Sequence, residues 1–564
     1  MISGKSATRG ILAPLCLIAA VLLSANGAFG QESQLGTVGF PTSGTPEAQR
    51  YFLRGLGALH SFWFEEALDN FTEATKIDPD FMMGYWGQAM SYNHPLWAQQ
   101  DTEAARKVVA KIHDTSRLTP REKAYLSAVK VLYGDGDKLA RDIAYSDAMA
   151  GLYRDYPNDM EAACFYALSL LGTVRPGDKG YKRQMLAGAI ALEVYGKNPN
   201  HPGAAHYIIH AFDDPDHAIL ALPAARRYAQ IAPEAHHARH MPSHIFLQLG
   251  MWPEAAASNE SSWATSDAWV KRKNLSIALR DYHSLHWLTY VYLQQGRDTK
   301  AAALITLLDK AILELGAEAG SSPMQHSLQN MSAAYVIETE SWDKAAELFN
   351  QSKHAGSGDA QASPHDAGAH AASGAAAQGM AYHDNGDFMA LFVKGFAAAQ
   401  RGTDDQTAGA SLHSMAAESS KAGQAYRGKQ LEILALEIDA VSKAHGGDFD
   451  SAVELMKKAV SIEDEMSPPS GPPDSIKPPR ELLGEILLRA GHPKEALQQF
   501  DASLSREPNR ARSLLGRARA LARAGDSVKA KEAYASFLEV WKQADSQLPE
   551  LAEAHGYLEQ AAGQ

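Results

Sequence analysis

Apolar side chains recur at every third or fourth position along most of this chain, and short polar turns separate the stretches that show the pattern. This spacing is typical of amphipathic α-helices, and no stretch shows the strict alternation of a half-buried strand. Residues 48–80 contain two such stretches with a turn between them. A helix pair cannot cover its own apolar face, so neighbouring pairs must stack. The pattern predicts an all-α protein built from helix-turn-helix units.

The units repeat at a fixed distance. Tyr51 and Gly55 are followed 34 positions later by Tyr85 and Ala89. The C-terminal part keeps the same register, with the pairs Ala496 and Ala530, and Phe500 and Tyr534. This period is that of the tetratricopeptide repeat (TPR). We therefore expect a TPR-like helix-turn-helix solenoid that winds as a right-handed superhelix.

Two stretches interrupt the helical pattern. Residues 355–379 consist mostly of Gly, Ala and small polar residues, which cannot bury enough apolar surface to order themselves. Residues 467–485 hold six prolines, which predict a non-helical crossing of the surface. The expected parts are a signal peptide (1–30), a flexible lead-in (31–45), an N-terminal TPR-like superhelix with histidine-rich repeats (46–354), a low-complexity loop (355–379) and C-terminal TPR-like repeats (380–564).

The N-terminus predicts export. Lys5 and Arg9 precede an apolar run at 11–23, and small residues at 28 and 30 suit a signal peptidase. The run is too short to span a bilayer comfortably. We expect cleavage before Gln31, which gives a periplasmic or secreted bacterial protein without an integral membrane segment. An uncleaved anchor is the alternative.

The net charge limits the kinds of partner this protein can have, and the cysteine content limits its disulfides. The formal net charge of −13 argues against a nucleic-acid partner or an anionic membrane surface, both of which favour basic patches. Cys164 is the one cysteine left after the signal peptide, so no intrachain disulfide can form. It lies in an apolar helical stretch, where we expect a buried small side chain.

Histidines concentrate between residues 201 and 244. This stretch holds eight of the 22 histidines, namely His201, His206, His210, His217, His236, His237, His240 and His244. His206 and His210 are four residues apart, as are His240 and His244, so each pair shares one helix face. The second pair follows the first by 34 residues. Two consecutive repeats therefore carry the same two imidazoles at equivalent positions.

Imidazoles on two neighbouring helices can meet at one metal ion. The predicted ligands are His206, His210, His240 and His244, with His217 and His283 as further candidates, and Zn²⁺, Cu²⁺ or another divalent ion suits them. Asp213 and Asp214 are candidates for a ligand, an orienting partner of a ring, or a catalytic base. The alternative is a structural role for the duplicated histidines. For His60 and His94, also 34 apart, the structural role is favoured.

The stretch from Asn198 to Trp263, with the sequences HPGAAHYIIHAFDDPDHA and AARRYAQIAPEAHHARHMPSHIF, resembles a group of exported bacterial TPR proteins. The segments HPLW and PPDSIKPPRELLGE resemble the same group, so the likeness covers most of the chain. This group has no settled activity. The resemblance implies a fold and a recurring histidine site, and no reaction.

Three functions fit these features. The first is an exported scaffold whose concave groove binds a protein or peptide and contains a metal-binding histidine cluster. The second is a zinc-dependent hydrolase with a small-molecule substrate, although the histidine pairs lack the glutamate of His-Glu-x-x-His. The third is metal sequestration or delivery.

Overall fold

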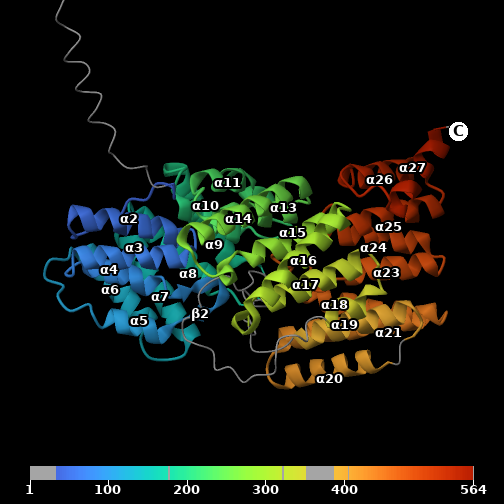
Figure 1. Cartoon of the computed structure of the whole chain (residues 1–564), viewed down its shortest axis with the longest axis horizontal. Helices are drawn as coiled ribbons and strands as arrows, with labels where there is room; N and C mark the ends of the chain where they lie inside the picture. The colour runs from blue at the N-terminus through green and yellow to red at the C-terminus, as the bar shows by residue number, and fades with distance from the viewer. Residues whose placement is uncertain are drawn as a thin grey trace, which may run out of the picture. The chain divides into compact units, whose positions relative to one another are not determined.

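Consecutive helices pair along their length and stack on the next pair (Figure 1). The computed structural model describes residues 34–175, 178, 180–319, 323–350, 386–403 and 406–562. The all-α, TPR-like helix-turn-helix fold is thereby confirmed. The predicted signal peptide and the predicted loop at 355–379 lie outside the described residues. Among the helices that are described, none is both long and apolar enough to cross a membrane.

The first helices precede the histidine-rich stretch. They are α2 (Pro46–His60), α3 (Phe64–Ile77), α4 (Met82–Met90), α5 (Thr102–Val109), α6 (Pro120–Leu132), α7 (Lys138–Asp155), α8 (Met160–Gly172) and α9 (Lys182–Lys197). Between α4 and α5, the two-residue strands β1 (Asn93–His94) and β2 (Gln99–Gln100) pair antiparallel around the short 3₁₀ helix η1 (Pro95–Trp97). No strand was expected there.

The histidine-rich helices occupy the middle of the described chain. They are α10 (Pro202–Ala211), α11 (Ala218–Ile231), α12 (His236–His240), α13 (Pro242–Gln248), α14 (Trp252–Lys273), the 3₁₀ helix η2 (Ile277–Leu279) and α15 (Tyr282–Gln294). Helix α10 contacts α13 and α2, so segments far apart in sequence lie side by side here.

The C-terminal helices continue the stack. They are α16 (Asp298–Leu315), the 3₁₀ helix η3 (Gly316–Ala319), α17 (Pro323–Glu338), α18 (Lys344–Asn350), α19 (Gly386–Gln400), α20 (Thr407–Lys421), α21 (Ala425–His445), α22 (Phe449–Asp464), α23 (Pro479–Arg489), α24 (Pro493–Arg506), α25 (Ala511–Arg523), α26 (Ser527–Val540) and α27 (Pro549–Ala562).

The repeat period has a packing cause. A Cβ atom added to Gly87 would lie 2.3 Å from the ring of Phe71, and one added to Gly55 would lie 3.0 Å from the same ring. The aromatic ring of the second helix is thus held between one small position on its own partner helix and one on the next unit. Phe500 repeats this arrangement with Gly516, where the added Cβ would lie 2.3 Å away. Close helix approach therefore requires small residues at this register.

The structure differs from the flexible lead-in that composition predicted. Leu35 and Phe40 are each 1% exposed, so residues 35–45 bury apolar side chains against the helices. The Gly39 amide donates a hydrogen bond of 3.1 Å to the Glu161 carboxylate. The Thr45 side chain caps α2. These contacts order the segment, because burial and hydrogen bonding offset the entropy that is lost.

The proline-rich segment was predicted to be a non-helical crossing over residues 467–485; it is non-helical up to Pro478, and residues 479–485 belong to α23. The Pro469 carbonyl accepts a hydrogen bond of 2.8 Å from Gln248 on α13. A Cβ atom added to Gly471 would lie 2.6 Å from the Trp287 ring on α15. The segment therefore lies against the histidine-rich helices and connects α22 to α23 across them.

Candidate metal centre

Six imidazole rings from four helices lie close together in the middle of the stack. Five of them form a closed ring, with centroid distances of 4.8 Å (His206 to His210), 5.8 Å (His210 to His244), 5.1 Å (His244 to His240), 6.0 Å (His240 to His237) and 5.1 Å (His237 to His206). The sixth, His283 of α15, lies 4.6 Å from His240. The rings of His206 and His240 are fully buried.

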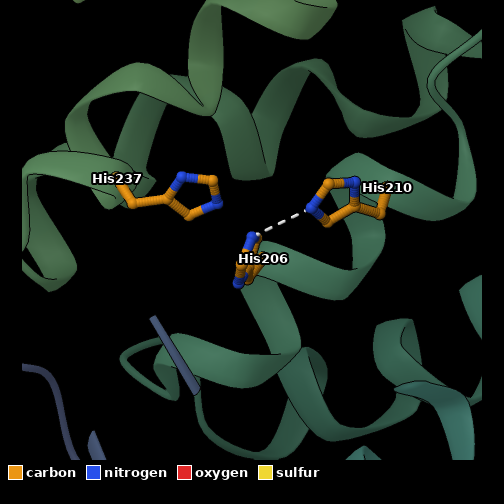
Figure 2. Close-up of side chains that lie close together, drawn as sticks. All are labelled: His206, His210 and His237. Carbon is orange, nitrogen blue, oxygen red and sulfur yellow. Dashed lines mark hydrogen bonds between the residues drawn. The ribbon is translucent and has the colours of Figure 1, made fainter. Parts of the chain in front are cut away.

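The six rings divide into two sets of three. One set is His206, His210 and His237, and the other is His240, His244 and His283. Within each set, one ring nitrogen from every histidine lies within 4.8 Å of the others. Figure 2 shows the first set, in which the three rings point toward a common space. The sequence predicted one site of four histidines, and the structure places these residues in two triads instead.

In the first triad, a backbone carbonyl fixes the protonation of one ring. His206 Nδ1 donates a hydrogen bond of 2.7 Å to the His60 carbonyl, which can only accept. When this ring is neutral, His206 Nε2 therefore carries a lone pair. It lies 3.1 Å from His210 Nε2 (Figure 2), and His237 Nε2 is buried without a hydrogen-bond partner.

The second triad is held in the same way by side chains. His240 Nδ1 donates to Asn259 Oδ1 at 2.7 Å, and Asn259 is itself oriented by its amide donating to the Ala255 carbonyl. His244 Nδ1 donates to Asp213 Oδ2 at 2.6 Å, which leaves His244 Nε2 buried without a partner. His283 Nε2 lies 3.1 Å from His240 Nε2.

These distances fit metal ligation. Two nitrogens bound to one tetrahedral ion at about 2.0–2.1 Å lie about 3.3 Å apart. The Nε2–Nε2 distance is 3.1 Å in each of the two pairs, one per triad. Partners that hold the Nδ1–H of a histidine orient the ring and raise its basicity as a ligand.

Burial favours the neutral form of five of the six rings. Burial, together with a smaller effect of the neighbouring His244, lowers the pKa of His206 and of His240 to about 3. The pKa values of His210, His237 and His283 lie well below the ordinary histidine value, again because of burial first and of neighbouring rings second. A neutral imidazole is the form that binds a metal ion.

A cavity of about 150 Å³ reaches both triads. His210 of the first triad and His244 of the second line it, together with Asp213. Other lining residues include Trp97 and Leu171 on the apolar side, and Arg175, Tyr181, Ser467, Pro468 and Ser470. The proline-rich segment therefore forms part of its wall.

The two predicted acids have separate roles. Asp213 accepts from His244 through one oxygen and from Gln248 through the other, at 3.3 Å, so it orients a candidate ligand. Asp214 accepts from the backbone amides of Asp216 and His217 and from the His217 ring. His217 lies outside both triads, and the expectation that it joins the cluster is wrong.

His237 is the cluster member that the sequence prediction missed. The signal was present, because His237 lies three residues before His240 in HHARH and one helical turn brings the two to the same face. The adjacent His236 instead faces Asp281, with 3.6 Å between Nδ1 and the carboxylate. It also contacts the rings of Trp63 and Trp269.

A third group of candidate ligands is already satisfied by protein partners. Glu161 accepts from His60 Nε2 at 2.6 Å, from His201 Nε2 at 3.2 Å and from the Gly39 amide. His60 Nδ1 accepts from Tyr207, and His201 Nδ1 accepts from the Ala204 amide. This network joins α2, α8 and α10 and needs no ion, in keeping with the structural role predicted for His60.

Comparison with known proteins adds little to this site. No family model matches the chain, and no curated protein matches it by sequence. Yeast Tom70 is similar with a TM-score of 0.33 at 11% identity, covering 92% of this chain and 96% of that one. Human IFIT1 with m7Gppp-AAAA scores 0.33 at 13% identity, covering 87% and 90%, and the P58(IPK) TPR domain scores 0.21 at 17%, covering 72% and 100%. At these scores the likenesses carry no argument about function.

Proposed function

We propose that the protein binds a transition-metal ion at the six-histidine cluster. The observation that carries this is the set of Nε2 lone pairs on His206, His240 and His244, each fixed by an Nδ1–H that is donated elsewhere. An acceptor buried without a donor costs about 1–3 kcal/mol. One ring nitrogen of each triad, His237 Nε2 in the first and His244 Nε2 in the second, is buried without a partner, and a cation bound by the triad satisfies it.

The ligand chemistry limits the class of metal. Each triad offers three imidazoles and contains no thiolate or carboxylate. Such a set suits Zn²⁺, Cu²⁺ or a similar borderline cation, and it does not suit Ca²⁺ or Mg²⁺, which take oxygen ligands. We propose Zn²⁺ or Cu²⁺.

We propose further that the helical stack acts as a scaffold that presents this centre. The cavity beside His210 and His244 gives a small ligand access to it. Binding of a protein or peptide along the repeats, and export of the chain, are proposals from the sequence pattern. Hydrolysis is not favoured, because the predicted bases Asp213 and Asp214 are both engaged with histidines.

Elemental analysis of protein purified without a histidine tag tests the proposal. The expected result is Zn²⁺ or Cu²⁺ in stoichiometric amount, removed by a strong chelator and restored on adding the ion back. The thermal unfolding midpoint is expected to fall on removal, since an ion that binds only the folded state stabilises it. Protein that contains no transition metal and takes none up at micromolar concentration would show that the proposal is wrong.

Asp213→Asn is expected to weaken metal binding by about 10–100-fold, which is the usual effect of losing a residue that orients a metal ligand. The amide holds the His244 ring less strongly than the carboxylate does, because a charged acceptor makes the stronger hydrogen bond. Competition with a chromophoric chelator measures the affinity. Asp214→Asn is the matched control, because Asp214 contacts His217 and no cluster histidine. Equal affinities for the two variants would contradict the role given to Asp213.

A further inference from the structure

We infer that the loaded centre holds two metal ions, one in each triad, and that these ions share a small anion which enters from the cavity. This inference rests on the proposed function. Each triad supplies its own three ring nitrogens, so no histidine has to serve both ions. The triads adjoin directly, since His210 lies 5.8 Å from His244 and His237 lies 6.0 Å from His240, centroid to centroid.

The positive charge of a centre loaded with two metal ions favours binding of an anion. Two divalent ions bring four positive charges, and six neutral imidazoles bring none. Two carboxylates lie near the rings: Asp213 bonds His244, and Asp281 caps α15 two residues before His283. The cavity wall adds Asp214, while its other carboxylate, Asp178, is paired with Arg183 at 3.0 Å. Three carboxylates then stand against four positive charges and leave the centre positive. A buried uncompensated charge is strongly unfavourable, so an anion from solvent completes the site.

The cavity provides the route for this anion. It touches one histidine of each triad, His210 and His244, so a ligand at its inner end meets both ions. Its volume of about 150 Å³ exceeds the roughly 10–15 Å³ that one water needs by the same measure. Arg175 in the wall adds a positive charge along the way. The ligand class is a small anion, with hydroxide as the occupant in plain buffer.

Such a bridged pair has a defined chemical consequence. The two triads would hold the ions, and the ions would supply Lewis acidity, which lowers the pKa of a bound water strongly so that its proton would pass to solvent. The anion can then be exchanged for another of similar size. Asp213 holds His244 through this exchange, since its contact is with Nδ1 and the ion is on Nε2.

Titration of the metal-free protein with CoCl₂ tests the inference, with binding followed by visible absorption. The expected result is two equivalents per chain, spin coupling between them by electron paramagnetic resonance, and a shift of the absorption bands on adding sodium azide. His283→Gln is expected to retain one equivalent and to lose the coupling. His217→Gln is the matched control and is expected to behave as the wild type, with far-UV circular dichroism confirming that both variants fold.

The outcomes separate the two proposals. Two coupled equivalents that respond to azide support the inference. One equivalent, or two uncoupled equivalents that ignore azide, overturns it and leaves metal binding intact, whereas no bound cobalt, zinc or copper overturns both. Ser470→Trp places a large side chain in the cavity. This variant is expected to bind both equivalents of cobalt and to bind azide at least tenfold more slowly. Unchanged azide kinetics in this variant would overturn the proposed route.

Discussion

Replacing Arg510 by methionine is expected to lower the free energy of unfolding by about 3–5 kcal/mol, the range for breaking a buried ion pair from one side. The Arg510 side chain is fully buried and bonds Glu481 at 2.9 Å, Glu338 at 2.7 Å and the Tyr290 hydroxyl at 3.0 Å. It therefore joins α15, α17 and α23 to the start of α25. Without it, two carboxylates stay buried with fewer partners. Urea denaturation followed by circular dichroism measures the loss.

Arg517→Met is the control, since this arginine pairs with Asp501 at the surface. Exposed pairs contribute about 0–1 kcal/mol, so the control is expected to unfold near the wild type. The triple variant Arg510→Met/Glu338→Gln/Glu481→Gln is expected to regain part of the stability, because the uncompensated charges are gone. If Arg510→Met and Arg517→Met unfold at the same urea concentration, the buried network does not join the repeats as described.

The double variant His206→Ala/His240→Ala is expected to lose stoichiometric metal. Each substitution removes the central ligand of one triad, the ring that lies 3.1 Å from its neighbour. The affinity for the metal is expected to fall by more than the roughly 10–100-fold that follows when a residue orienting a ligand is lost. Elemental analysis after dialysis, with competition titration for the residual affinity, checks the result.

His217→Ala is the matched control for this pair of substitutions. It lies in the same histidine-rich stretch, yet its ring contacts Asp214 and Tyr181 and no cluster histidine. Metal content is expected to stay at the wild-type level. A double variant that folds and still holds its metal would show that the ion binds elsewhere.

Local sequence could predict much of the fold. The register of Gly55, Phe71 and Gly87 follows from side-chain size alone, because an aromatic ring needs a small residue on each helix that it touches. The capping residues are equally local, as Thr119 and Glu122 show at the start of α6, where both halves of the capping box form. The lead-in was not predictable in this way. Leu35 and Phe40 are ordered by helices that follow much later in the chain.

The candidate site was predicted in part. The duplicated spacing identified His206, His210, His240 and His244 because residues four apart share a helix face. It did not show that α12 and α13 are separate short helices with Pro242 at the start of the second. The break lies between His240 of α12 and His244 of α13, which still meet in the second triad, whereas His237 shares α12 with His240 and joins the first triad. The third ligand of the second triad, His283, comes from the next helix pair.

The apolar periodicity and the 34-residue spacing are enough to predict stacked helix pairs, two of which carry the same imidazoles in succession. Which nitrogens face one another follows from the packing of the helices, because it depends on atoms distant in sequence. The His60 carbonyl, Asn259 and Asp213 fix the rings from three different elements. Burial, also a property of the whole stack, favours the neutral form of rings such as His206 and His240. Periodicity can place a side chain on a helix face, but it cannot set the distances of about 3 Å between helices that ligation requires.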